Sequence, residues 1–228
     1  MEGADRIMKL YSQSRNSAGE RVRIALHLKG IDYDYVAIPS LPPGDYRRIN
    51  PQGLMPALET GGKVIAQSTA ILEFLEEIHP SPALLPDDPV ARAEVRSFAQ
   101  LIASDLHPLN NYRIRRYLGA KLGAGEAEIL AWYRHWVAVA FGALEETLRR
   151  RPQSPFCFGG APGWADLHLV PHLSTVRRFG CDLAPYPRLL AVEANCIALD
   201  AFRRARPEAQ PDFDGEIRTV VRPGQPPP

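Results

Sequence analysis

Side chains able to handle an anion gather where the first helix of the chain should begin. The stretch SRNSAGERVRIAL (14–26) places Arg15 and Ser17 immediately before an amphipathic helical pattern. The first turn of a helix has unpaired N–H groups and partial positive charge, so it can bind an anion or stabilise a thiolate. By itself the segment favours a plainer interpretation, in which Ser17 caps the helix and Arg15 is a surface arginine.

Two later segments carry groups that would complete a binding groove. In GLMPAL, a cis bond before Pro56 would turn the backbone N–H and C=O of Met55 outward, where an extended peptide could pair with them. A trans proline at a strand start is the common alternative. Gln67 and Ser68 begin another helical pattern, either as a second anion site or as a plain N-cap. Together the three segments predict a thiolate site, a peptide-pairing edge and a carboxylate site in one groove.

A small α/β domain must position these groups. Strand and helix patterns alternate as a β-α-β unit followed by a β-β-α unit: strands 6–12, 33–38, 55–60 and 63–68, and helices 17–29 and 69–79. Gly30 ends the first helix, and the Gly61–Gly62 pair predicts an antiparallel hairpin. The Pro/Gly-rich segment PSLPPGDYRR (39–48) between these units is predicted to be a loop.

A proline-rich segment, PSPALLPDDPV, separates this domain from a second half in which helical periodicity dominates. The segment after Arg206 is rich in proline and is predicted to be disordered. The predicted organisation is an α/β domain, a linker, an all-helical domain and a disordered tail, over 1–80, 81–90, 91–211 and 212–228.

Bulk composition excludes several classes of function. The net charge of +1 over 228 residues gives no argument for a nucleic-acid partner. Three cysteines without C-x-x-C spacing argue against a disulfide framework, a zinc site or a dithiol redox centre. The chain shows neither a signal-peptide pattern nor an apolar run of membrane-spanning length. We therefore expect a cytoplasmic protein without a bound metal.

The combined segments, over residues 8–211, resemble the glutathione transferase superfamily. NPQGLMPAL, QSTAILEFLEE, PALLPDDP and LVPHLSTVRRFGCDLAPYP are similar to the zeta class, which contains maleylacetoacetate and maleylpyruvate isomerases. The resemblance implies a thioredoxin-like α/β N-terminal domain, an all-α C-terminal domain, glutathione as cofactor and a homodimer.

The resemblance also implies roles for individual residues in holding glutathione. Gln67 and Ser68 would bind the γ-glutamyl carboxylate, Met55 beside Pro56 would pair with the cysteinyl backbone, and Gln52 would lie near the glycyl end. The thiolate motif reads NSAG here, so Ser17 is its one hydroxyl and Ala18 replaces the family's cysteine or threonine. Ser17 is therefore the expected thiolate partner.

In the helical half, SDLHPLNNYRIRRYL resembles the D-x-H-P-x-N-N-x-R pattern of bacterial maleylpyruvate isomerases. Pro108 is expected to bend the helix or start a new turn. The plainer alternatives are a hydrogen-bonded structural role for the histidine and a helix-bend role for the first asparagine. Asp105 stands where relatives reach the partner subunit's glutathione. The matching residues are Asp105, His107, Asn110, Asn111 and Arg113.

Arginine suits a dicarboxylate substrate because its planar fork bonds carboxylate oxygens in pairs. Arg15, Arg113 and Arg178 form the expected clamp, with Arg177 expected to face solvent. The expected reaction is conversion of maleylpyruvate to fumarylpyruvate by reversible addition of glutathione thiolate. The alternatives are maleylacetoacetate isomerisation, conjugation or dehalogenation of other electrophiles, and non-catalytic binding. Asp166 is expected to serve folding, although Gly163 leaves its capping box incomplete.

Overall fold

The computed structural model describes residues 8–215, and their contacts divide them into two compact units. The first unit contains the residues up to Leu84 together with Ile197–Gly215, and the second contains Leu85–Cys196. The boundary between Leu84 and Leu85 falls within the predicted linker. The expected disorder of 216–228 lies outside the described residues.

The first unit is built on a four-stranded mixed sheet in the order β2-β1-β3-β4. The strands are β1 (Met8–Ser12), β2 (Tyr33–Ala37), β3 (Ala57–Thr60) and β4 (Lys63–Ala66). β1 runs parallel to β2 and antiparallel to β3, and β3 and β4 form the predicted hairpin. Because side chains alternate along a strand, Leu10 and Leu58 pair on one face while Tyr11 and Ala57 pair on the other.

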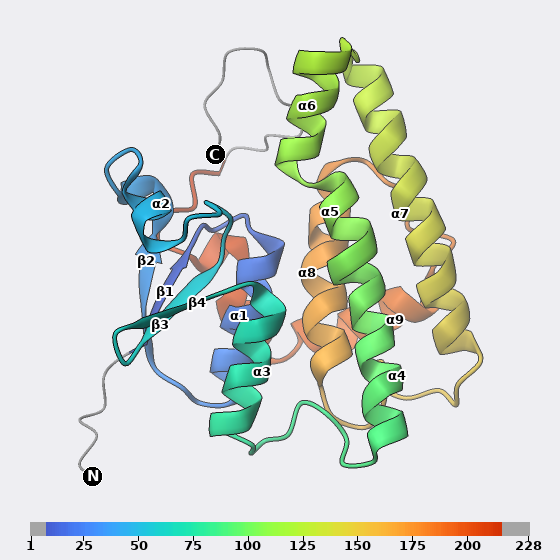
Figure 1. Cartoon of the computed structure of the whole chain (residues 1–228). Helices are drawn as coiled ribbons and strands as arrows, with labels where there is room; N and C mark the ends of the chain where they lie inside the picture. The colour runs from blue at the N-terminus through green and yellow to red at the C-terminus, as the bar shows by residue number, and fades with distance from the viewer. Residues whose placement is uncertain (1–7, 216–228) are drawn as a thin grey trace. The chain divides into compact units, whose positions relative to one another are not determined.

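Helices α1 (Ser17–Leu28) and α3 (Ser68–Ile78) lie on one side of this sheet, as Figure 1 shows, and α2 (Asp45–Ile49) lies toward the other. Tyr46 of α2 packs against Tyr11 with 6.3 Å between ring centroids. The predicted loop 39–48 therefore contains a short helix, preceded by a 3-10 turn at Ile38–Ser40. The prediction missed this helix because its five residues are too few to show a helical period.

The C-terminal part of the first unit returns to pack on α1. It contains α10 (Asp200–Ala205) and a 3-10 turn (Pro207–Ala209). The fully buried guanidinium of Arg23 on α1 donates to the Ala205 carbonyl at 2.8 Å. The predicted helical domain extended to residue 211, whereas the contacts group Ile197–Gly215 with the α/β unit. The periodicity of α10 reveals a helix but not the surface against which it packs.

The second unit is helical, and its long helices run side by side in Figure 1. Trp164, Tyr133 and Phe141 are among its fully buried side chains. α4 continues through a π-helical turn (Leu101–Leu106) into α5, where Pro108 has no N–H to donate to the preceding turn. A new α-helical turn begins at His107, immediately before Pro108, which agrees with the expectation that Pro108 bends the helix or starts a new turn. The helices are α4 (Pro89–Gln100), α5 (His107–Asn110), α6 (Tyr112–Leu122), α7 (Glu126–Arg149), α8 (Trp164–Arg178) and α9 (Pro187–Ile197).

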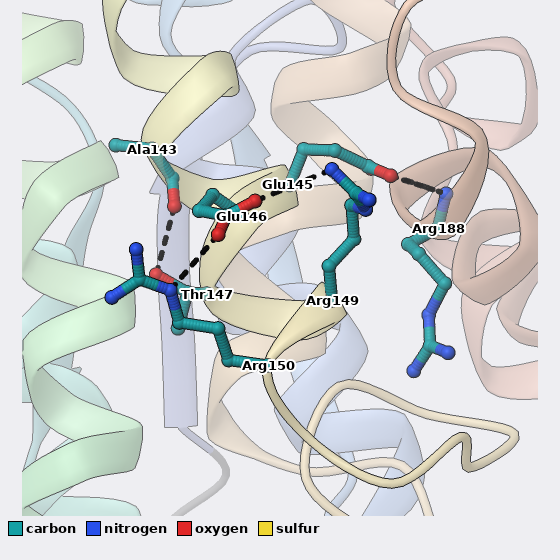
Figure 2. Close-up of polar contacts among 7 residues, drawn as sticks. All are labelled: Ala143, Glu145, Glu146, Thr147, Arg149, Arg150 and Arg188. Carbon is teal, nitrogen blue, oxygen red and sulfur yellow. Dashed lines mark hydrogen bonds and ion pairs between the residues drawn. The ribbon is translucent and has the colours of Figure 1, made fainter.

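Two carboxylates in this unit accept backbone N–H groups at helix starts, Glu145 at the start of α9 and Asp166 at the start of its own helix, α8. Figure 2 shows Glu145 of α7 accepting the Arg188 N–H at the start of α9, at 3.0 Å, and its carboxylate also accepts the Leu189 N–H at 3.1 Å. Asp166 accepts the N–H groups of Cys157 at 2.9 Å and Gly163 at 2.8 Å. Because Gly163 has no side chain, only one half of the capping box forms. These contacts agree with the structural role expected for Asp166.

Gly19 lets the start of α1 approach β1, and a methyl group there should destabilise the fold. A Cβ at Gly19 would lie 2.0 Å from Ser12 Oγ and 2.9 Å from Asn16 Oδ1. We expect Gly19→Ala to lower the free energy of unfolding by about 1–2 kcal/mol in urea titrations. Gly142→Ala is the matched control, because among the described residues no such atom lies within 4 Å. Its expected effect is a gain of about 0.5–1 kcal/mol, and equal effects at both sites would contradict the packing argument.

His27 should make the protein less stable in mild acid. Burial lowers its pKa from 6.5 to about 4, and the positive charges of Arg204 and Arg23 act in the same direction. The folded state thus binds fewer protons than the unfolded state, so stability is full above about pH 6.5 and is lost as pH falls toward 4. Because the ring is only partly buried, we expect a loss of about 1 kcal/mol.

Urea titrations between pH 7 and 4 would measure this fall in the free energy of unfolding, the acid limb of the stability profile. His27→Gln should flatten it, whereas His135→Gln, at an exposed position on α7, should leave it unchanged. An unchanged limb in His27→Gln would assign the acid sensitivity to other groups.

Candidate functional site

The start of α1 is capped by Asn16, whose side-chain oxygen accepts the Gly19 N–H. Ser17 is the first helical residue and is buried. The alternative in which Ser17 caps the helix is therefore wrong, because the cap must precede the first helical residue. Within residues 8–215 the Ser17 hydroxyl has no hydrogen-bond partner, and the first N–H groups of α1 have no intrahelical acceptor. Asn16 takes the Gly19 N–H, so the Ser17 hydroxyl and the N–H groups of Ser17 and Ala18 are the donors that remain available to an anion.

Arg15 lies beside this helix start, but it contacts the C-terminal part of the same unit. Its guanidinium forms an ion pair with Asp214 and lies 4.8 Å from the centroid of the Phe213 ring. Only 16% of its side chain is exposed. The simple surface placement of Arg15 is therefore wrong, because aromatic and acidic neighbours cover the side chain.

The predicted polar groups around β3 and α3 lie together. The Met55–Pro56 peptide bond is cis. The Gln67 side-chain amide donates to Gln52 Oε1 at 2.7 Å, so two residues 15 positions apart meet. Gln67 has φ of +73°, which a side chain with a Cβ rarely adopts. Such an outlier points to a functional constraint on its backbone.

Ser68 is the first residue of α3 and is not its N-cap. Gln67 occupies the N-cap position. The Ser68 hydroxyl is buried and lies 3.4 Å from Arg21 Nη1 of α1. Burial lowers the pKa of Arg21 to about 10. Arg21 therefore brings positive charge to the start of α3, where an incoming carboxylate would be stabilised by charge as well as by N–H groups.

In the helical unit, the residues of the D-x-H-P-x-N-N-x-R pattern have different environments. Asp105 is exposed on the π-helical turn. His107 lies 5.8 Å from His172, measured between ring centroids. Asn110 is buried and donates to the Tyr133 carbonyl at 3.0 Å, and Asn111 caps α6 by accepting the Ile114 N–H at 3.2 Å. Both asparagines therefore hold the backbone around α6.

The two arginines at the end of α8 are distinguished by their partners. Arg177 forms an ion pair with the buried Glu193, and both of its terminal nitrogens contact that carboxylate. Arg178 is partly buried and donates to Thr175 Oγ1 at 3.1 Å. The two neighbouring arginines therefore differ in their partners, a buried carboxylate for Arg177 and a hydroxyl for Arg178.

Comparison with known proteins gives consistent results for both units. The profile of the glutathione S-transferase N-terminal domain matches residues 17–78, from the start of α1 to the end of α3. The chain is 47% identical over 210 residues to maleylpyruvate isomerase from a Ralstonia species, covering 90% of this chain and 99% of the relative. The chain belongs to the glutathione S-transferase family.

Solved structures similar to this chain belong to the same family and indicate its class. The holo structure of a maleyl pyruvate isomerase, described as a bacterial zeta-class transferase, has a TM-score of 0.86 and 47% identity, and the match covers 90% of this chain and 99% of that chain. A maleylacetoacetate isomerase from Methylobacterium extorquens AM1, with bound malonate and glutathione, has a TM-score of 0.84 and 40% identity, covering 89% and 98%. The predicted glutathione transferase fold and zeta-class membership are confirmed.

Arg115 of this zeta-class protein is a candidate functional residue that the sequence analysis did not predict. Its guanidinium lies 4.5 Å from the Phe179 ring centroid, and Phe179 stacks on Tyr133. Burial lowers the pKa of Arg115, and the positive charge of Arg178 acts in the same direction. Arg113 is exposed. Two residues apart on a helix point roughly 200° apart, so the run YRIRR does not reveal which arginine faces the unit's interior.

Residues 8–215 contain no group of three His, Cys, Asp or Glu side chains placed to hold a metal ion. No helix within those residues is both long and apolar enough to cross a bilayer. The three cysteines are free thiols.

Proposed function

We propose that this transferase is a glutathione-dependent cis–trans isomerase that converts maleylpyruvate to fumarylpyruvate. The observation that carries the proposal is the 47% identity to a maleylpyruvate isomerase over nearly the full length of that relative. A maleylacetoacetate isomerase of similar fold with bound glutathione supports the choice of cofactor.

The residues of the α/β unit fit glutathione by their chemistry. Ser68 and the strained Gln67, held by Gln52, would bind the γ-glutamyl carboxylate beside the positive charge of Arg21. The Met55 backbone would pair with the cysteinyl residue. The Ser17 hydroxyl and the first N–H groups of α1 would hold the sulfur in its anionic form.

When bound, glutathione supplies a thiolate that can add reversibly to the conjugated alkene and so permit rotation. The chain's own contribution is electrostatic. Arg15, Arg113 and Arg178 would bind the two substrate carboxylates and stabilise the charge that develops on the carbonyl oxygens. His107 on α5 would contribute to the same site. Since the charge grows during the reaction, these arginines should affect kcat as well as KM.

The test is a spectrophotometric assay of maleylpyruvate with and without glutathione. The proposal predicts loss of the substrate absorbance only when glutathione is present, with fumarylpyruvate as product. Glutathione-independent loss, or no loss, would contradict it. Maleylacetoacetate is the second candidate substrate, because a maleylacetoacetate isomerase from Pseudomonas aeruginosa is 41% identical over 212 residues. The ratio of kcat/KM values for the two substrates decides between them.

Gln67→Gly should separate binding from stability. Glycine adopts positive φ without steric cost, so we expect the free energy of unfolding to rise by about 1 kcal/mol. The same change removes the amide that contacts Gln52, and KM for glutathione should rise about tenfold. Urea titration and initial rates at varied glutathione measure the two effects. A parallel loss of stability and affinity would mean that Gln67 serves the fold.

We further propose a cytoplasmic homodimer. The exposed position of Asp105 on the π-helical turn suits a residue that reaches the partner subunit's glutathione. Free thiols suit a reducing compartment. Light scattering coupled to size-exclusion chromatography measures the mass. Asp105→Asn should raise KM for glutathione if this contact forms, and a monomeric, fully active enzyme would contradict the proposal.

A further inference from the structure

The C-terminal strap, residues 210–214, is fastened to the loop that precedes α1. The buried Gln210 side chain donates to the carbonyls of Arg204 at 2.8 Å and Arg206 at 2.9 Å. Asp212 Oδ2 accepts the Ser14 N–H at 2.9 Å. Hydrogen bonds therefore hold the strap at its first residue, Gln210, and at the loop before α1, although the strap and the loop are nearly 200 residues apart in sequence.

Asp212 is tied on both sides. Its Oδ1 accepts the Tyr35 hydroxyl proton at 2.9 Å, and its carbonyl oxygen accepts from Ser14 Oγ at 3.3 Å. The Ser14 carbonyl in turn accepts from Arg23 Nη2 at 3.1 Å. These bonds hold the strap and the loop in one network. The next two residues of the strap, Phe213 and Asp214, therefore lie against Arg15.

The contacts of Arg15 divide into a persistent and an exchangeable part. Phe213 lies beneath the guanidinium plane and would still attract the cation if the carboxylate moved away. Asp214 pairs with the guanidinium, and 44% of its side chain is exposed to solvent against 16% for Arg15. An ion pair with one solvated partner is weak, so another carboxylate could replace Asp214 at small cost.

We propose that Asp214 is a specificity-determining residue that occupies Arg15 in place of a substrate carboxylate and yields it when a dicarboxylate binds. This inference rests on the proposed role of Arg15 in substrate binding. A ligand with a single carboxylate must replace Asp214 with no second contact to offset the exchange. A dicarboxylate keeps a second anionic group for other arginines, so Asp214 selects for dianions.

The experiment is calorimetric titration of malonate into the glutathione-bound protein. Asp214→Asn keeps the shape of the side chain but removes its charge, and we expect malonate to bind about two- to fivefold more tightly. Glu208→Gln is the matched control, because Glu208 is an exposed carboxylate paired with Arg206 at 3.2 Å in the same region. It should leave the malonate affinity unchanged. Circular dichroism checks that each variant is folded.

The Arg15→Gln background tests whether Asp214 acts through Arg15. In that background, titrated to higher malonate concentrations, Asp214→Asn should no longer tighten binding. An equal gain in both backgrounds, or an equal gain in Glu208→Gln, would overturn the inference in favour of a general charge effect. Unchanged affinity in Asp214→Asn, in an enzyme that binds malonate and isomerises maleylpyruvate, would overturn the inference alone. Absence of both malonate binding and isomerisation in the unmodified protein would overturn the proposed function, and the inference with it.

Discussion

Replacing Arg178 by alanine is expected to lower kcat/KM for maleylpyruvate about a hundredfold. Arg178 ends α8 in a partly buried position and donates to the neutral hydroxyl of Thr175 at 3.1 Å. In the proposed clamp its charge acts on a substrate carboxylate, and a charge-assisted contact that strengthens in the transition state is worth about 3 kcal/mol. Steady-state rates with maleylpyruvate at saturating glutathione measure this loss.

A neutral electrophile separates loss of charge recognition from general damage. Glutathione conjugation of 1-chloro-2,4-dinitrobenzene, which has no carboxylate, should be nearly unchanged in Arg178→Ala. Arg177→Ala is the matched neighbour. Because Arg177 is paired with buried Glu193, its loss should lower the free energy of unfolding by about 1–2 kcal/mol and leave kcat/KM near that of the unmodified enzyme. Reversed behaviour of the two variants would transfer the substrate-binding role to Arg177.

Replacing Arg23 by methionine is expected to cost about 3–5 kcal/mol of stability. The guanidinium is fully buried and bonds the Ala205 carbonyl at 2.8 Å and the Ser14 carbonyl at 3.1 Å. Methionine fills similar volume but leaves these acceptors without a donor and removes the positive charge near Asp212. The loop before α1 and the C-terminal strap should loosen together, which would also raise KM for glutathione.

Urea unfolding measures the stability loss, and amide hydrogen exchange at Ser14 and Ala205 shows whether the two segments loosen together. Arg204→Met is the control, because Arg204 is 61% exposed and its ion pair with Asp200 spans 3.9 Å. It should change stability by less than about 0.5 kcal/mol. A small effect of Arg23→Met would mean that water replaces the guanidinium at these carbonyls.

Much of the α/β unit followed from local patterns. Gly30 has φ of +64° directly after α1, and the Gly61–Gly62 pair turns the β3–β4 hairpin as expected. These features depend on residues close in sequence, where side-chain period and glycine conformation leave few alternatives. The resemblance placed Gln67 at the γ-glutamyl carboxylate and Gln52 near the glycyl end of glutathione, and the direct contact between the two side chains was not predicted, since neither period nor composition relates the two positions.

Choices between neighbouring residues were harder to make from the sequence. Asn16 and Ser17 are both good N-caps, and the cap is decided by where α1 begins against β1. Arg113 and Arg115 have the same chemistry, but α6 points only Arg115 toward Phe179. In each pair the residue types are equivalent, so the packing of the element decides.

The sequence by itself determined the family, the order of the strands with α1 and α3 in the first unit, the helical character of the second, and the residues that we propose for binding glutathione and a dicarboxylate. Those properties are written in local periodicity and in motifs. Only the tertiary structure decided that the C-terminal strap covers Arg15 and that Arg177 is paired with Glu193. Contacts between residues so far apart in sequence depend on which surfaces pack together in the folded chain. The spacing of residues along the sequence does not predict that packing.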